Sequence, residues 1–148
     1  MSATLDRSRP LFYCTSFPVR VVKKMPAEVT APRVLVVDDD RSLADALSIM
    51  LNQHGFDTRA AYSGAEAIRA ALNSPPDFII MDIRMDGIDG VDTAIAICET
   101  LPRCRILLMS GAEHASQLEK SSKRGHHFDL LMKPVLATAL LEKLRFAS

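Results

Sequence analysis

Five short apolar segments, each followed by a segment of helical periodicity, constrain the fold of this chain more than any other feature. Four of them are nearly continuous apolar runs and one alternates, and all are short enough to be strands. They comprise residues 33–37, 56–62, 77–81, 105–109 and 128–132. The helical patterns cover residues 41–54, 64–73, 91–100, 112–124 and 136–146. This alternation predicts an α/β fold with a doubly wound parallel sheet, five helices on its two faces and right-handed crossovers.

Capping residues mark the ends of the first two predicted helices. Asp40 and Ser63 each precede a helix as residues that accept hydrogen bonds from its first turn, and Gly55 follows the first helix as a C-terminal cap. The apolar spacing predicts which side chains face the core. They are Leu43, Ala46, Leu47, Met50 and Leu51 in the first helix and Ala67, Ile68, Ala71 and Leu72 in the second.

Charge and composition exclude several classes of protein. Eighteen Lys and Arg residues balance eighteen Asp and Glu residues among 148, and this zero net charge argues against a nucleic-acid-binding protein. The three cysteines, Cys14, Cys98 and Cys104, have neither disulfide-framework nor zinc-site spacing, so we expect reduced thiols. No apolar run reaches the roughly 18 residues of a membrane span, and no secretory signal is visible. A cytoplasmic protein without membrane contact is therefore predicted.

Residues 1–31 differ from the rest of the chain. They contain scattered prolines and five basic residues against two acids, without a sustained apolar period. We therefore expect a poorly ordered N-terminal arm (1–31) before a single folded domain (32–148). Met25 offers an alternative start of translation, which would leave residues 1–24 out of the native protein.

Chemically active side chains follow four of the predicted strands. Asp38, Asp39 and Asp40 follow the first, Asp82 the third, Ser110 the fourth and Lys133 the fifth. In open α/β sheets, binding sites form outside the carboxyl ends of the strands. We therefore expect these side chains to meet at one edge of the sheet.

Several carboxylates at one point need a cation. A sparse set of oxygen ligands that leaves room for water favours Mg²⁺, which usually shares its coordination with a phosphate. Asp82, between Lys133 and Ser110, is the natural nucleophile, because carboxylates can attack phosphorus and form aspartyl phosphates. The Lys133 ammonium would neutralise charge, and the Ser110 hydroxyl would donate to a phosphoryl oxygen. We predict that Asp40 caps the following helix and binds no metal.

Residues 33–146 resemble the receiver domain of two-component response regulators. The resemblance rests on four motifs in order at the strand ends: VLVVDDD, IIMDIRMDGIDG, LLMSGA and LLMKPV. It implies a flavodoxin-like fold with strand order 2-1-3-4-5 and Asp82 as the phosphoacceptor. It also implies Mg²⁺ bound directly by Asp39, Asp82 and the Arg84 backbone carbonyl, and through water by Asp38. Ser110 would be the switch hydroxyl and Lys133 the phosphoryl-binding lysine, followed by Pro134 after a bond that is often cis in the family.

Some positions depart from the family pattern or vary within it. Asp86 stands where the family usually has proline, so the loop loses a restraint on φ and gains a charge near the metal. Leu130 replaces the aromatic residue that usually turns inward on activation. Gly111 and Ala112 are small residues that leave access to the acceptor. Together with Arg84, Ala112 is expected to set the lifetime of the phosphorylated state.

The remaining polar residues are interpreted as ordinary surface groups. Asp86 and Asp89 are read as polar loop residues, although Asp86 could also tune the metal site. Adjacent histidines at a strand entry point apart and lack further ligands, so His126 and His127 are not predicted to bind zinc. The basic run is interpreted as a solvated face; it comprises Lys120, Lys123 and Arg124.

The sequence thus predicts a phosphorelay protein rather than an enzyme with an external substrate. A histidine kinase or histidine phosphotransfer protein would phosphorylate Asp82, and the change would alter contacts with an unknown downstream protein. Since the chain stops soon after the last helix, we expect a stand-alone receiver, and a homodimer remains open. Two alternatives are kept: a degenerate receiver that acts as an unphosphorylated scaffold, and a Mg²⁺-dependent phosphohydrolase. The second is disfavoured because Arg84 stands where such enzymes commonly have a second aspartate.

Overall fold

A computed structural model describes residues 30–111 and 115–145 and contains the predicted alternation of strands and helices. The longest described helix has 13 residues, and no helix in this part of the chain is long and apolar enough to cross a membrane. The predicted arm, apart from its last two residues, and Ala112 lie outside the described ranges. The elements are β1 Arg33–Val37, α1 Arg41–Gln53, β2 Asp57–Ala61, α2 Gly64–Asn73, β3 Phe78–Asp82, α3 Gly90–Thr100, β4 Arg105–Ser110, α4 Ala115–Lys123, β5 Asp129–Met132 and α5 Ala137–Arg145.

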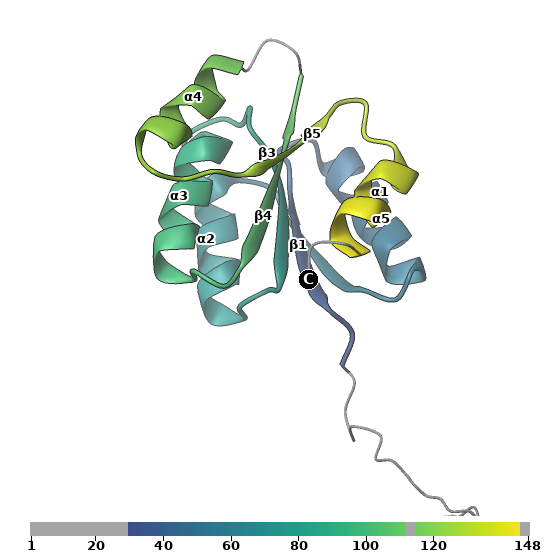
Figure 1. Ribbon diagram of the computed structural model, residues 1–148. Coiled ribbons are helices and arrows are strands. Elements are labelled where there is room, and N and C mark those ends of the chain that lie inside the picture. The colour runs from purple at the N-terminus through teal and green to yellow at the C-terminus, as the bar shows by residue number, and fades with distance from the viewer. Residues whose placement is uncertain (1–29, 112–114, 146–148) are drawn as a thin grey trace, which may run out of the picture. The chain divides into compact units, whose positions relative to one another are not determined.

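The five strands form one parallel sheet in the order β2-β1-β3-β4-β5 (Figure 1). Strand β1 pairs on one edge with β2, where Val36 is opposite Ala60, and on the other edge with β3, where Val37 is opposite Met81. The chain therefore reverses its direction of winding after β2. This is the flavodoxin-like arrangement that the sequence predicted, and it creates a switch point between β1 and β3.

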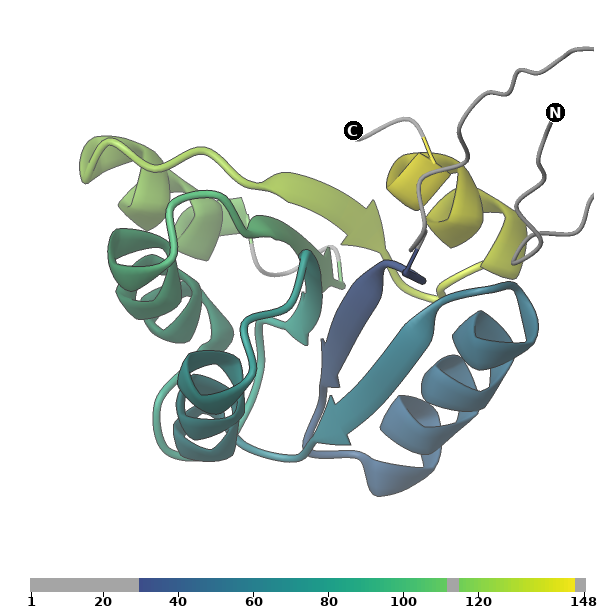
Figure 2. The same ribbon diagram turned by 90° about the horizontal axis from the view of Figure 1, so that it is seen from below.

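Alternate side chains of the sheet contribute to two separate hydrophobic cores. Leu35 and Val37 of β1 face the layer made by α2, α3 and α4, whereas Val34 and Val36 face α1 and α5. The two helical layers lie on opposite sides of the sheet in both views (Figures 1 and 2). Because both faces of each central strand are covered, the near-continuous apolar runs are the pattern expected of buried parallel strands.

The predicted caps of α1 and α2 are confirmed. The Asp40 carboxylate accepts from the Leu43 N–H at 3.3 Å, and the Ser63 hydroxyl accepts from the Glu66 N–H at 3.1 Å. Gly55 ends α1 with a φ of +93°.

The predicted inward faces are wrong at two positions. Ala46 and Leu72 are exposed, Leu72 by 48%. In α1 the buried face instead includes Ala44 and Ser48. Ser48 is tolerated there because its hydroxyl donates to the Ala44 carbonyl at 2.9 Å.

Candidate functional site

The predicted site residues lie together at the carboxyl edge of the sheet because parallel pairing continues to the strand ends. Asp82 is the last residue of β3 and is opposite Met109 of β4, while Ser110 ends β4. Backbone hydrogen bonds extend this order beyond the strands: the Asp38 N–H donates to the Ala61 carbonyl at 3.1 Å, and the Lys133 N–H donates to the Ser110 carbonyl at 2.9 Å. The positions of the candidate site residues are therefore set by the sheet itself.

Three carboxylates converge at the switch point. Asp38, Asp39 and Asp82 each offer an oxygen, and these oxygens lie within 4.8 Å of one another. Asp38 is 1% and Asp82 5% exposed, whereas Asp39 is open to solvent. An all-oxygen set with one accessible member suits a hard cation that keeps some of its water, as Mg²⁺ does. The residues present therefore fit the predicted metal.

Lys133 supplies the positive charge of the site. Its ammonium nitrogen lies 3.1 Å from Asp82 Oδ1 and 3.4 Å from Asp38 Oδ2. Burial is the largest influence on Lys133 and lowers its pKa, but the carboxylates of Asp82 and Asp38 outweigh burial and raise the pKa above its ordinary value. Lys133 therefore stays charged, and in the protein without metal it is the cation between two buried carboxylates.

Burial of the Asp38 carboxyl group disfavours its ionised form. Burial raises the pKa of its carboxyl group, and the neighbouring charge of Asp82 adds to the effect. The hydrogen bond from the Asp40 N–H, at 2.9 Å, and the Lys133 ammonium oppose the shift without cancelling it. The ionised form of Asp38 is therefore held at a net cost that a bound cation would relieve.

The Ser110 side chain is hydrogen-bonded to the backbone, whereas the backbone N–H of Arg84 contacts Asp82. The buried Ser110 hydroxyl donates to the Gly111 carbonyl at 2.6 Å, so it would have to leave this bond to reach a phosphoryl group. The Arg84 N–H donates to Asp82 Oδ1 at 3.4 Å, which places this loop residue against the acid cluster.

The residues expected to tune the site occupy different environments. Asp86 is exposed in the β3–α3 loop, and Gly111 is half-buried directly after β4. Leu130 is half-buried and packs against the core on the α2–α4 side. Pro134 follows a cis peptide bond, as the resemblance implied.

Some roles on this side of the molecule were not found from the sequence. Asp89 lies in the loop before α3, as interpreted, but it is also the N-cap of α3, because its carboxylate accepts from the Asp92 N–H at 2.8 Å. The acid at Asp92, three residues later, was the available signal. Arg124 is not merely solvated, because its guanidinium bonds to Asp92. His126 contacts Glu99, whereas His127 is exposed as predicted.

Comparisons with known proteins agree with this geometry. The family model described as the response regulator receiver domain matches residues 34–145. The transcriptional regulatory protein PrrA of Mycobacterium tuberculosis is 34% identical over 125 residues, which cover 82% of this chain and 52% of PrrA. The chain thus spans about half the length of the curated relatives of this kind.

Solved receiver structures are similar in fold as well. The chemotaxis protein CheY4 of Vibrio cholerae has a TM-score of 0.70 and 26% identity, covering 78% of this chain and 98% of that one. The receiver domain of NtrX from Brucella abortus has a TM-score of 0.69 and 27% identity, covering 77% and 96%. Together with the sheet order and the matched family model, these similarities show that the chain belongs to the response regulator receiver domain family.

Proposed function

We propose that Asp82 accepts a phosphoryl group from a phosphohistidine of a histidine kinase or phosphotransfer protein, and that this changes the contacts of the domain with a downstream protein. The observation that carries the proposal is the convergence of three carboxylates at the sheet edge, two of which, Asp38 and Asp82, pair with the Lys133 ammonium. In-line phosphoryl transfer needs positioning and charge neutralisation more than acid–base catalysis. A site of this composition is suited to that reaction.

The chain's own residues would have distinct roles. An Asp82 carboxylate oxygen would form the new P–O bond while the P–N bond of the donor imidazole breaks. Asp39 and Asp82, with the Arg84 carbonyl, would hold Mg²⁺ directly, and Asp38 would act through water. The metal would supply charge neutralisation at the phosphoryl oxygens. Lys133 would exchange its contact with the Asp82 carboxylate for one with the phosphoryl group.

The switch would begin at Ser110. Its hydroxyl would leave the Gly111 carbonyl and donate to the phosphoryl group, which would draw the β4–α4 connection toward the site. Phosphorylation can shift the populations of two states only by such differential contacts. Because Leu130 lacks a ring and a polar tip, the change in this domain would pass through the backbone of that connection rather than through an inward-turning aromatic residue.

Phosphorylation with a small donor tests the site without a cognate kinase. Labelled acetyl phosphate and Mg²⁺ should label the protein, and EDTA should prevent it. Asp82→Asn should lose the label, whereas Asp86→Asn, which removes an exposed acid from the same loop, should retain it. Label on Asp82→Asn would refute the assignment of the acceptor.

Two further measurements separate the alternatives. Absence of Mg²⁺-dependent beryllofluoride binding would favour an unphosphorylated scaffold. Multiple-turnover hydrolysis of a phosphomonoester would favour a phosphohydrolase. The receiver function predicts stoichiometric beryllofluoride binding and no such turnover.

We further propose that the folded domain spans residues 32–148 and acts in the cytoplasm.

A further inference from the structure

The C-terminal end of α4 is closed by a hydrogen-bonded turn that fixes the residues on both sides of Gly125. Gly125 has a φ of +83°. Its N–H donates to the Ser122 carbonyl at 3.0 Å, and the His126 N–H donates to the Ser121 carbonyl at 2.9 Å. This pair of bonds is a Schellman motif, which leaves little freedom in the direction of the chain. Arg124 and His126 are consequently presented by a rigid turn.

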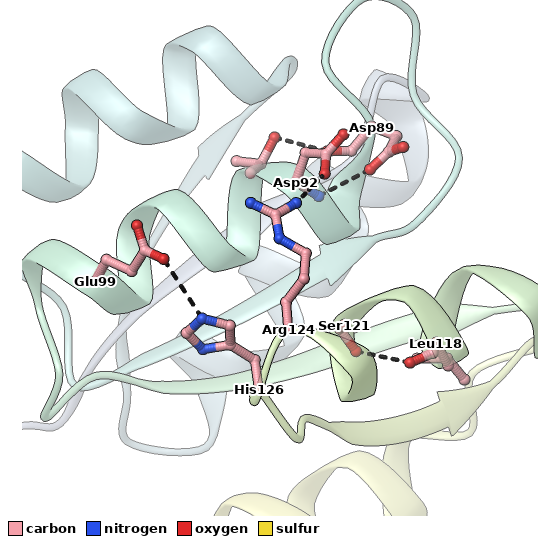
Figure 3. Close-up of polar contacts among 8 residues, drawn as sticks. Asp89, Asp92, Glu99, Leu118, Ser121, Arg124 and His126 are labelled. Carbon is pink, nitrogen blue, oxygen red and sulfur yellow. Dashed lines mark hydrogen bonds and ion pairs between the residues drawn. The ribbon is translucent and has the colours of Figure 1, made fainter.

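Both presented side chains contact α3 (Figure 3). Arg124 Nη1 lies 3.3 Å from Asp92 Oδ1, and His126 Nε2 lies 3.5 Å from Glu99 Oε2. Asp92 and Glu99 are seven residues apart, so they lie about two turns apart on one side of α3. The His126 ring also stacks on Phe128, with the ring centroids 6.1 Å apart and the planes within 2°. We call Asp92, Glu99, Arg124 and His126 the α3–α4 clasp.

The end of α1 shows what is unusual about this clasp. The end of α1 also has a Schellman motif, in which the Gly55 N–H donates to the Asn52 carbonyl and the Phe56 N–H donates to the Leu51 carbonyl. There the residue after the glycine, Phe56, is half-buried and packs against the hydrophobic core, as is common in such motifs. At the end of α4 the equivalent residue is His126. The α4 end is thus held to its neighbour by charged and polar groups.

One residue of the clasp, Asp92, lies in the first turn of α3, which packs against Asp82. Gly90, the first residue of α3, donates its N–H to the Ile83 carbonyl at 2.8 Å. A Cβ atom at Gly90 would collide with the Asp82 carbonyl oxygen and come within 2.7 Å of Ile83 Cα. In the same turn, the Asp92 N–H donates a hydrogen bond to the carboxylate of the N-cap residue Asp89 at 2.8 Å. The first turn of α3 is therefore in direct backbone contact with Asp82, without spare room.

We infer that Arg124 is a positioning residue for the Asp82 site, acting through Asp92 and the first turn of α3. The inference rests on the proposed function, since it concerns the same acceptor. Arg124 restrains the turn from the α4 side, and the turn restrains the Asp82 backbone. Such coupling is reciprocal. If the Arg124–Asp92 contact raises the affinity of the site for a ligand by some factor, the bound ligand strengthens that contact by the same factor.

The exposure of the pair sets the size of the effect. The side chains of Arg124 and Asp92 are 51% and 38% exposed, so solvent screens their attraction. An ion pair of this kind can supply a change in affinity of about 1.5- to 5-fold. The effect should also shrink as salt is raised to about 1 M, where charges are screened within roughly 3 Å.

The test measures the Kd for beryllofluoride in the presence of Mg²⁺ by titration calorimetry, using the full chain. The variants are Arg124→Gln, Asp92→Asn and the double variant, with Arg124→Lys as the conservative rescue. Lys123→Gln is the matched control, because it removes the same charge from the preceding, exposed residue. We expect Arg124→Gln to weaken binding about 1.5- to 5-fold beyond the control. Arg124→Lys should restore most of the affinity, and the double variant should be no weaker than the weaker single variant.

The outcomes separate this inference from the function on which it rests. If the unmodified protein binds no beryllofluoride, the proposed function fails and the inference fails with it. If it binds, and Arg124→Gln matches Lys123→Gln, the site stands and the role of Arg124 is refuted. Additive losses in the double variant would likewise show that Arg124 does not act through Asp92.

Discussion

Replacing Asp38 with asparagine should stabilise the protein without metal. At an effective dielectric constant of about 20, Lys133 at 3.4 Å attracts the Asp38 carboxylate by about 5 kcal/mol, and Asp82 within 4.8 Å repels it by at least about 3.5 kcal/mol. The balance is a small attraction, whereas burying a carboxylate costs several kcal/mol. Asparagine removes that cost and keeps an oxygen that can accept from the Asp40 N–H. The expected gain is about 1–2 kcal/mol in the free energy of unfolding.

Urea denaturation in EDTA at pH 7 measures this gain. Asp40→Asn is the control, because it removes the neighbouring charge but keeps an equally good N-cap, and it should change stability little. Mg²⁺ should stabilise the unmodified protein more than Asp38→Asn, because the variant loses one carboxylate of the metal site. An Asp38→Asn variant less stable than the unmodified protein in EDTA would refute the argument that burial, rather than pairing with Lys133, dominates at this position.

The same reasoning fixes the pH dependence. The folded-state pKa of Asp38 is raised above its ordinary value of 3.8, so ionisation costs stability as pH rises through that folded-state pKa. Below pH 3.8, Asp38 is mostly protonated in both the folded and the unfolded protein. The advantage of Asp38→Asn should therefore disappear in acid, and an advantage that persists there would point to a cause other than charge.

Three further predictions concern packing, titration and capping. Gly90→Ala should lower the free energy of unfolding by about 2–3 kcal/mol, because the new Cβ meets the Asp82 carbonyl oxygen; a loss below 0.5 kcal/mol in urea denaturation would contradict this. Burial raises the pKa of the Cys104 thiol to about 12, from 9.0. Between pH 9 and 12 the thiol therefore keeps its proton in the folded protein but loses it in the unfolded chain, so the free energy of unfolding should fall over that range. Unfolding curves of Cys104→Ala should show a shallower fall over that range, and equal slopes would argue against the shift. Asp40→Ala should cost about 1 kcal/mol by leaving the Leu43 N–H without its acceptor, whereas an unchanged urea midpoint would show that the cap is dispensable.

The convergence of the candidate site residues was predictable because strand ends place them. Once five buried strands are recognised, parallel pairing alone brings Asp38, Asp82, Ser110 and Lys133 to one edge. The caps at Asp40 and Ser63 were also predictable, because a cap bonds to the helix that directly follows it.

Contacts between distant segments were not predictable in this way. The Arg124–Asp92 bond joins residues 32 positions apart, and it exists only because α3 and the end of α4 pack side by side. Ala46 was assigned to the wrong face because a short alanine-containing pattern leaves the rotation of a helix loosely defined. Leu72 fits the apolar period of α2 but stays exposed near the end of the helix, where little structure covers it. Packing, rather than local pattern, decides such positions.

The central place of β1 has a consequence for how the chain is made. Although β1 precedes the other four strands, it needs a partner on each edge, and β3 ends at Asp82, 45 residues after Val37. At a synthesis rate of about 5–20 residues per second, one edge of β1 stays open for roughly 2–9 s on the ribosome. An open apolar strand is a template for pairing with other chains. Flanking charges oppose such pairing, so Arg33 and the acids that begin at Asp38 protect the nascent strand before those acids form the finished site.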